Sequence, residues 1–109
     1  MPRAVLRTEF FDAILNATPV GMHPHDGVSP LAPGELHCRL VMDLINRPQR
    51  TQLLKIAARK GIATVPGVEM LIAQGIAQWE IWTEKRAPEA SMRRAVLAAL
   101  RAEENSRDR

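Results

Sequence analysis

Three residues near the start of one predicted helix have types and spacing suited to holding a small ligand. Met70 and Gln74 follow Gly67 by three and seven positions, so at 100° per residue the three share one helical face. A glutamine amide hydrogen-bonds hydroxyl groups, and a methionine thioether packs well against a flat ring. The spacing also fits a surface glutamine beside a methionine at the edge of the core, and it leaves both interpretations open.

Two other segments place small or polar residues directly after predicted strands. The first is NATPVGM at 16–22 and the second runs from Asp43 to Asn46. Ligands of open α/β sheets bind beyond the carboxyl ends of the strands, so both segments are candidates for a site. For the first segment a strand-ending turn is an equal alternative, because Asn, Thr, Pro and Gly form such turns for local reasons.

A metal centre is the weaker interpretation of the histidine-containing loop. His23, His25, Asp26, His37 and Cys38 lie in or beside a proline-rich stretch, and their spacing matches no zinc pattern. We therefore expect no metal. A single cysteine forms no internal disulfide, which fits a reducing cytoplasm.

The elements that would position these residues alternate between strands and helices. Apolar runs followed by turn signals predict strands at 12–17, 39–45 and 62–65, with a long loop at 22–38 that holds one helical turn. Helices are predicted at 51–60, from 68 and from about 88. The second helix commits one apolar stripe to the core, formed by Val68, Leu71, Ile72, Ile76, Trp79 and Trp82.

This order predicts an α/β fold. Strand, helix and strand at 39–65 form a βαβ crossover, and strands this apolar need cover on both faces. The expected architecture is a partial doubly wound, Rossmann-like parallel sheet of about three strands with helices on both faces.

Composition bounds the class of protein. The chain has 109 residues, 46% of them apolar, and 15 Lys plus Arg against 12 Asp plus Glu give a net charge of +3. These values predict one small domain with scattered surface charge. The sequence lacks the basic stripe interleaved with aromatic residues that is typical of nucleic-acid binding. Its apolar runs are also much shorter than the roughly 20 residues of a membrane span. We expect neither partner.

Several blocks together resemble the C-terminal part of shikimate dehydrogenase over residues 10–100. They are NATPVGM at 16–22, Asp43 followed by Pro48, TQLL at 51–54, GVEMLIAQG at 67–75 and WEIWT at 79–83. The block from Gly67 and the aromatic-Glu-x-aromatic-Thr pattern are the specific ones. The Gly-x-Glu-Met variant and Gln78-Trp-Glu are also similar to the dehydrogenase part of fused dehydroquinate dehydratase and shikimate dehydrogenase chains.

The resemblance implies an NADP-dependent interconversion of 3-dehydroshikimate and shikimate, a step of aromatic amino-acid biosynthesis. It also implies roles for individual positions along NADP. Asn16, Ala17 and Thr18 would lie along the cofactor. Leu44 and the backbone of Gly67 would approach the nicotinamide half, and Met70 would pack on its ring.

For the substrate, the resemblance implies that Gln74 bonds a hydroxyl of shikimate. Asn46 stands where the family usually has a tyrosine that helps to hold the substrate. An asparagine still forms hydrogen bonds, but it has a shorter reach and no ring. A quinate or aminoshikimate dehydrogenase therefore remains an alternative.

The family's catalytic Lys and Asp, its Gly-rich pyrophosphate turn and most of its substrate pocket belong to parts that this sequence does not contain. The resemblance thus implies a single partial domain over 1–109. It assigns 10–87 to the C-terminal half of the NADP-binding domain, 88–103 to a C-terminal helix and 104–109 to a frayed tail. We expect no catalysis by the chain alone.

The strand order of the family leaves the first strand without its usual neighbour. An unpaired apolar edge attracts other chains, so we expect self-association or pairing with a separate N-terminal half. A non-catalytic remnant of the fold that binds a partner through this edge is the alternative function.

Overall fold

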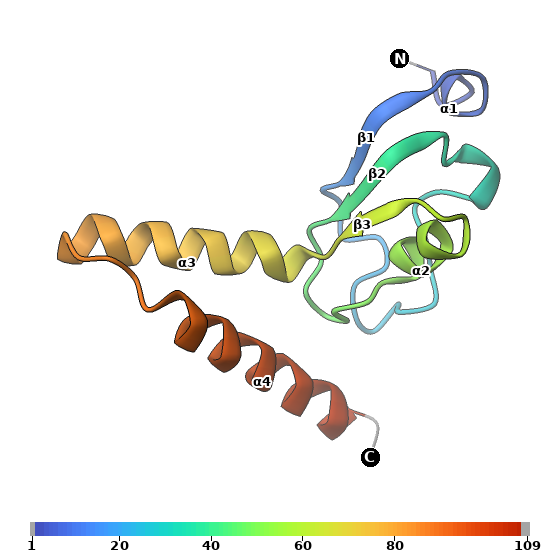
Figure 1. Ribbon diagram of the computed structural model, residues 1–109. Helices are drawn as coiled ribbons and strands as arrows, with labels where there is room; N and C mark the ends of the chain where they lie inside the picture. The colour runs from blue at the N-terminus through green and yellow to red at the C-terminus, as the bar shows by residue number, and fades with distance from the viewer. Residues whose placement is uncertain (1, 108–109) are drawn as a thin grey trace.

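The computed structural model describes residues 2–107 (Figure 1). Its elements follow the predicted order, with one short helix, α1, that the sequence did not indicate. They are α1 (Val5–Thr8), β1 (Phe11–Asn16), the 3₁₀ helix η1 (Pro33–Glu35), β2 (Cys38–Asp43), α2 (Gln52–Arg59), β3 (Ala63–Val65), α3 (Gly67–Thr83) and α4 (Glu89–Arg107).

The three strands form one parallel sheet in the order β1-β2-β3. In the register of β1 and β2, Asn16 lies opposite Asp43, so both strands end at the same level. The predicted α/β fold with a three-stranded parallel sheet is confirmed. Within the described chain β1 has β2 as its one neighbouring strand, so its outer edge is open.

Helix α2 covers one face of the sheet and forms the main core with it. Thr51 caps this helix, since its hydroxyl accepts a hydrogen bond from the amide of Leu54. Gly61 follows the helix with φ +76°, a conformation that suits glycine. The buried cluster consists of Leu36, Cys38, Val41, Leu53, Leu54 and Ala57.

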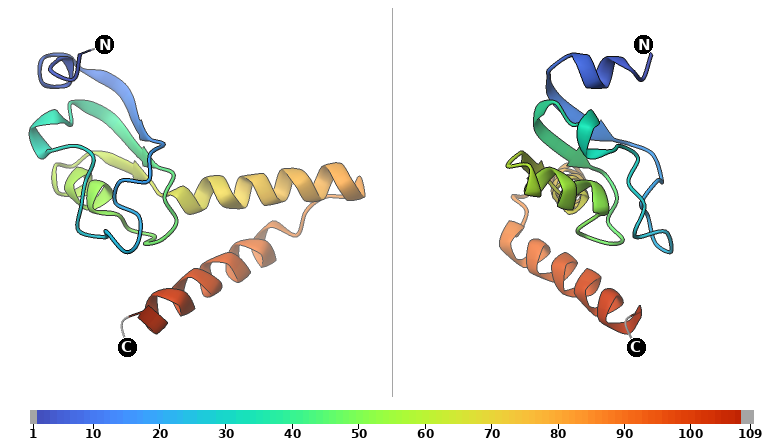
Figure 2. Two further views of the ribbon diagram at one scale, coloured as in Figure 1. Left: turned by 180° about the vertical axis from the view of Figure 1, so that it is seen from behind. Right: turned by 90° about the vertical axis from the view of Figure 1, so that its right-hand side faces the viewer.

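The opposite face of the sheet differs from the expectation of helices on both faces. Figure 2 shows α2 and the loop between β1 and β2 on the same side of the sheet. Leu15 points away from the α2 side, because side chains alternate along a strand, and it is 57% exposed. Strand β1 thus carries apolar side chains on both of its faces, and α2 covers one of these faces.

Helices α3 and α4 form an arm that projects from the sheet and folds back on itself (Figures 1 and 2). Their contact is apolar and consists of Val68, Ile72 and Leu100 with Ile76, Val96 and Leu97 around them. One ion pair joins the two helices, in which Arg93 donates to Glu69 at 2.7 and 3.0 Å.

The prediction that one apolar stripe of α3 is buried in the core is wrong in part. Val68 and Ile72 are buried, but Leu71, Trp79 and Trp82 are exposed at 39%, 42% and 76%. One helix, α4, packs against α3 and covers one side of it. Because α3 is apolar around most of its circumference, its periodicity does not show which side is covered.

The C-terminal helix continues beyond the predicted boundary. Residues 104–107, expected to fray, are helical, and residues 108–109 lie outside the described part of the chain. The helix is held at this end, because Glu104 accepts a hydrogen bond of 2.8 Å from the backbone amide of Gln49. Glu103 pairs with Arg47. Side-chain contacts to a distant loop therefore order a segment that is polar in sequence.

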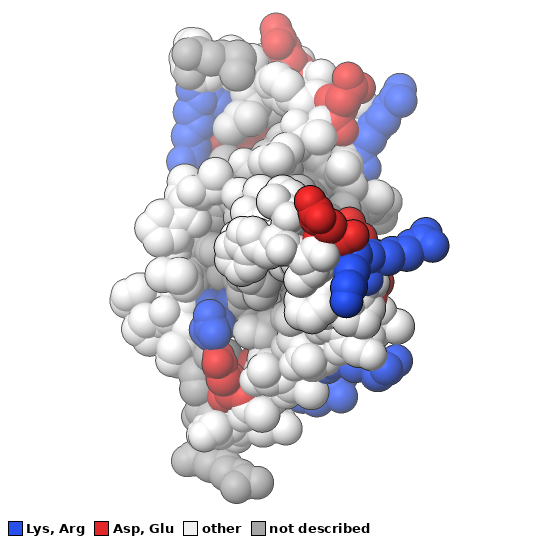
Figure 3. All heavy atoms as spheres, turned by 90° about the vertical axis from the view of Figure 1, so that its left-hand side faces the viewer, with Lys and Arg blue, Asp and Glu red and all other residues white. Residues whose placement is uncertain are grey.

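The surface at the tip of the arm carries charges of both signs, from Glu84, Lys85 and Arg86 in the turn between α3 and α4. Figure 3 views the molecule from this side and shows charged side chains of both signs scattered over it. None of the described helices combines the length and the apolar composition that a membrane crossing needs.

An ion pair fastens the amino-terminal segment to the loop before β2. Arg3 donates to both carboxylate oxygens of Glu35, at 2.7 and 2.8 Å, and Glu35 also accepts from the amide of Ala32 at 2.9 Å. The hydrogen bond from Arg3 is the largest cause that lowers the pKa of Glu35, to about 2 from an ordinary 4.5.

This pair predicts a specific acid sensitivity. A pKa lowered in the folded state stabilises the fold at pH values above the ordinary pKa, and that stability is lost as pH falls from about 4.5 towards 2. Glu35→Gln should flatten the fall in urea midpoint over this range, and Arg3→Ala should flatten it similarly. A Glu35→Gln protein with the same pH slope as the parent would contradict the assignment.

Candidate functional site at the strand ends

A buried polar network joins the carboxyl ends of β1 and β2. Asp43 is fully buried and Asn16 is 5% exposed. The Asn16 amide nitrogen donates to Asp43 Oδ1 at 3.2 Å, and the same oxygen accepts from the amide of Ile45 at 3.1 Å. The other oxygen, Oδ2, accepts from the Thr51 hydroxyl at 2.7 Å. Asp43 therefore links both strand ends and the start of α2.

Asn16 shapes the loop that follows β1. Its Oδ1 accepts from the backbone amide of Thr18 at 3.0 Å and from the Thr18 hydroxyl at 2.6 Å. Its Nδ2 also donates to the carbonyl of Val20 at 3.2 Å. The Asn16 side chain is thus engaged within the protein, so its effect on a ligand would pass through the shape of this loop.

A surface hollow of about 400 Å³ opens between the two strand-end loops. Four of the predicted site residues line it, namely Ala17 and Thr18 from the first loop and Leu44 and Asn46 from the second. The remaining lining residues are Pro19, Met22, His23, Ile45 and Arg47. Asn46 Oδ1 is buried and has no hydrogen-bond partner among the described residues. A buried acceptor without a donor is an unfavourable arrangement, which a shift of the Asn46 side chain towards the hollow would relieve.

Gly67 brings the start of α3 against the second loop. A Cβ at this position would lie 2.6 Å from the carbonyl carbon and oxygen of Leu44 and 2.7 Å from the carbonyl oxygen of Ile45. These are backbone atoms, so only glycine fits. The close approach sets the beginning of α3 directly beside the loop that forms one wall of the hollow.

Met70 and Gln74 continue from Gly67 along one side of α3. Met70 is 41% exposed and Gln74 is exposed, and neither lines the hollow. Gln74 lies about 10 Å along the helix from Gly67 at 1.5 Å per residue. Of the eight predicted residues, the structure thus gathers four around the hollow, buries Asn16 in the polar network and places Gly67 behind Leu44. Met70 and Gln74 lie on an exposed side of α3.

Sequence reasoning missed two features of this region. Asp43 stood out as a strand-end residue, but its role as the centre of the network was not predicted. The contacts of Arg47 and Gln49 with Glu103 and Glu104 on α4 were also missed. A carboxylate that ends an apolar strand, eight residues before a helix-capping threonine, is a signal for the first feature. No local signal exists for the second, because it joins residues more than 50 positions apart.

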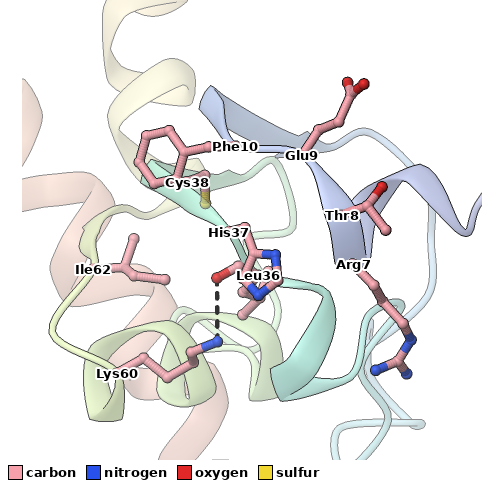
Figure 4. Close-up of a pocket in the computed structure, with 9 residues that line it drawn as sticks. All are labelled: Arg7, Thr8, Glu9, Phe10, Leu36, His37, Cys38, Lys60 and Ile62. Atoms are coloured by element: carbon pink, nitrogen blue, oxygen red, sulfur yellow. Dashed lines mark hydrogen bonds between the residues drawn. The ribbon is translucent and has the colours of Figure 1, made fainter.

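A second hollow, of about 390 Å³, lies near the amino end of β2 (Figure 4). One of its polar groups is engaged within the protein, since Lys60 Nζ donates to the carbonyl oxygens of Leu36 and Pro33. Burial raises the pKa of the Cys38 thiol, so this cysteine has little thiolate character. Within residues 2–107 no group of three or more His, Cys, Asp or Glu side chains could hold a metal ion.

Parallel strands, a βαβ crossover and a hollow beyond the strand ends are features of a doubly wound, Rossmann-like α/β fold. The shikimate 5'-dehydrogenase C-terminal domain family matches residues 67–97. Over 92 residues the chain is 44% identical to the shikimate dehydrogenase (NADP(+)) of Methanopyrus kandleri, and the match covers 83% of this chain and 32% of that protein.

Solved structures extend the similarity to the fold. The shikimate 5-dehydrogenase of Thermus thermophilus, in complex with NADP(H) and shikimate, matches with a TM-score of 0.79 and 31% identity over 92% of this chain and 38% of its own. Quinate dehydrogenase from Corynebacterium glutamicum, in complex with NAD, matches with a TM-score of 0.77 and 30% identity over 88% and 33%.

The chain is thus similar, over most of its length, to the C-terminal part of shikimate dehydrogenases. It spans about a third of the length of the curated relatives that it matches. The resemblance read from the sequence is confirmed at the level of the family. The similarity to fused dehydratase and dehydrogenase chains stays a prediction.

Proposed function

We propose that this chain forms the nicotinamide-facing wall, and one side of the substrate site, of an NADP-dependent shikimate dehydrogenase that interconverts 3-dehydroshikimate and shikimate. The observation that carries the proposal is the hollow at the strand ends. Residues that the family resemblance assigns to the cofactor, from two different loops, line one space there. In this proposal residues 10–87 are the C-terminal half of the NADP-binding domain.

The lining suits the nicotinamide half of NADP. Ala17 is small, Thr18 offers a hydroxyl and Leu44 offers an apolar side chain beside the backbone of Gly67. Asn46 Oδ1 offers an acceptor that has no partner in the described chain. When bound, NADP(H) supplies or accepts the hydride. The residues of this chain orient the ring, and Met70 packs against it from α3.

Gln74 is the residue that we assign to the substrate. It lies on the side of α3 that α4 leaves uncovered, with its amide free to bond a hydroxyl of shikimate. Asn46 is the second substrate contact in this proposal. The proton-transfer groups and the pyrophosphate turn come from the parts of the relatives that this chain does not span.

Partners and location follow from the same proposal. The open edge of β1 would pair with a strand of a separate N-terminal half or with another copy of the chain. A cytoplasmic location fits a biosynthetic enzyme with a single buried cysteine.

The test is NADP+-dependent oxidation of shikimate, first by this chain alone and then with a separately produced N-terminal half of the Methanopyrus kandleri relative. We expect no turnover by the chain alone, and turnover when the added half completes the site. The N-terminal half alone is the matched control. Association of the two proteins without turnover would contradict the enzymatic proposal and favour the partner-binding remnant.

Quinate or aminoshikimate dehydrogenation is the second candidate, and Asn46 is the observation that favours it. This position usually carries a substrate-holding tyrosine in the family, and a quinate dehydrogenase is among the similar structures. Running shikimate and quinate side by side in the same assay distinguishes them by the ratio of kcat/KM values.

A further inference from the structure

We propose that Asp43 is a positioning residue, which holds the two walls of the strand-end hollow at the separation that the nicotinamide ring requires. This inference rests on the proposed function and extends it to a residue that touches neither cofactor nor substrate. Asp43 is fully buried, and three donors from three different segments converge on its carboxylate.

The first donor controls the wall formed by the loop after β1. Asn16 Nδ2 donates to Asp43 Oδ1, which fixes the orientation of the Asn16 amide. With that orientation, Asn16 Oδ1 receives both donors of Thr18, and Thr18 Oγ1 in turn accepts from the amide of Val20 at 3.2 Å. Asp43 therefore acts on Ala17 and Thr18 through Asn16.

The second donor controls the opposite wall. The amide of Ile45 donates to the same Oδ1 atom of Asp43, and Ile45 lies between Leu44 and Asn46, which line the hollow. One oxygen atom thus bonds to both walls at distances of 3.2 and 3.1 Å. Two backbone hydrogen bonds also join the walls, from the amide of Leu44 to the carbonyl of Asn16 at 3.1 Å and from the amide of His23 to the carbonyl of Arg47 at 2.8 Å. Without Asp43 these two bonds would remain, but the Asn16 side chain and the amide of Ile45 would lose their common acceptor.

The third donor, Thr51, stabilises α2, and this role can be tested separately from the roles of the first two donors. Thr51 donates to Oδ2 and caps α2, and neither Thr51 nor the start of α2 lines the hollow. Removing the Thr51 hydroxyl therefore perturbs the network and the stability of the fold but leaves the walls bonded to Oδ1. This makes Thr51→Ala a control for the structural role of Asp43.

The experiment uses the full chain, with two readouts from amide-resolved NMR. Hydrogen exchange of the Thr18 and Ile45 amides reports whether the walls are held. Titration with NADP+, followed through the shifts of Ala17, Thr18 and Leu44, gives a Kd. The variants are Asn16→Ala, Asp43→Ala, Asp43→Asn and Thr51→Ala, with global stability measured in urea for each.

We expect Asn16→Ala and Asp43→Ala to speed exchange in the walls at least tenfold and to raise the Kd for NADP+ at least fivefold. Thr51→Ala should speed exchange at Leu54 and leave the Kd unchanged. Asp43→Asn keeps an acceptor oxygen for both walls, so it should recover most of the affinity that Asp43→Ala loses.

Two results would overturn the proposal. A Kd that follows global stability in every variant, including Thr51→Ala, would assign Asp43 a purely structural role. Unchanged affinity in Asn16→Ala despite mobile walls would show that their separation does not matter. If the parent chain shows no shifts at the hollow, the proposed cofactor wall itself fails. The exchange data would then still show separately whether Asp43 holds the loops.

Discussion

Replacing Gly67 with alanine should lower the free energy of unfolding by about 3 kcal/mol, at the upper end of what overpacking usually costs. The added methyl group would lie 2.6 Å from the carbonyl group of Leu44 and 2.7 Å from the carbonyl oxygen of Ile45. Backbone atoms at the end of a strand cannot turn aside as a flexible side chain can, so either α3 or the loop must move. The urea midpoint of the purified variant measures the loss.

Gly75 provides a matched control on the same helix. A Cβ there would meet one atom, the terminal methyl of Met92 at 3.3 Å, which can rotate away. Because alanine favours the helical conformation more than glycine, Gly75→Ala should be neutral or stabilise the protein by up to about 1 kcal/mol. Equal losses at both positions would mean that the close approach at Gly67 does not limit stability.

The contact at Gly67 also separates two reasons for a glycine at this position. The resemblance implies that its backbone approaches the nicotinamide, which would by itself favour a residue without a side chain. The structure gives an independent reason, because the junction of α3 with the loop after β2 has no room for a Cβ even without a ligand. Loss of activity in Gly67→Ala would therefore not identify a cofactor contact.

The sequence predicted the elements well where local signals and burial agree. In α2, a capping threonine, buried positions at Leu53, Leu54 and Ala57 and a terminal glycine all indicate the same helix. The edge position of β1 and the uncovered side of α3 could not be read from periodicity. Apolar residues lie on more than one side of both elements, so the composition allows either side to be buried. The packing of neighbouring elements decides which side is buried.

For the candidate site, the sequence indicated the segments at the strand ends but not the arrangement that joins them. Strand-end reasoning led to Thr18 and Asn46, and the register of the parallel strands then brings their loops to one level. The Asp43 carboxylate and two backbone hydrogen bonds join the loops. No spacing rule places Asn16, which is 27 positions away, beside Asp43. The ordered end of α4 has the same origin, since Glu104 and Gln49 are far apart in sequence.

Replacing Gln74 with leucine should raise the KM for shikimate about 10- to 100-fold in the reconstituted assay, with a smaller effect on the KM for NADP+. In the proposed function, the Gln74 amide bonds a substrate hydroxyl. Leucine removes both its donor and its acceptor, so the substrate hydroxyl loses this partner. Initial rates at saturating NADP+, measured over a range of shikimate concentrations, give the value.

Gln78→Leu is the control that makes the Gln74 result specific. Both glutamines are exposed on α3, and one helical turn separates them, so the two substitutions change helix propensity and surface polarity alike. Gln78 lies about 6 Å further from the sheet along the helix, so its replacement should leave the KM for shikimate within twofold of the parent. Similar increases in both variants would mean that leucine on this side of α3 disturbs docking of the added half, and Gln74 would then have no separate role in holding the substrate.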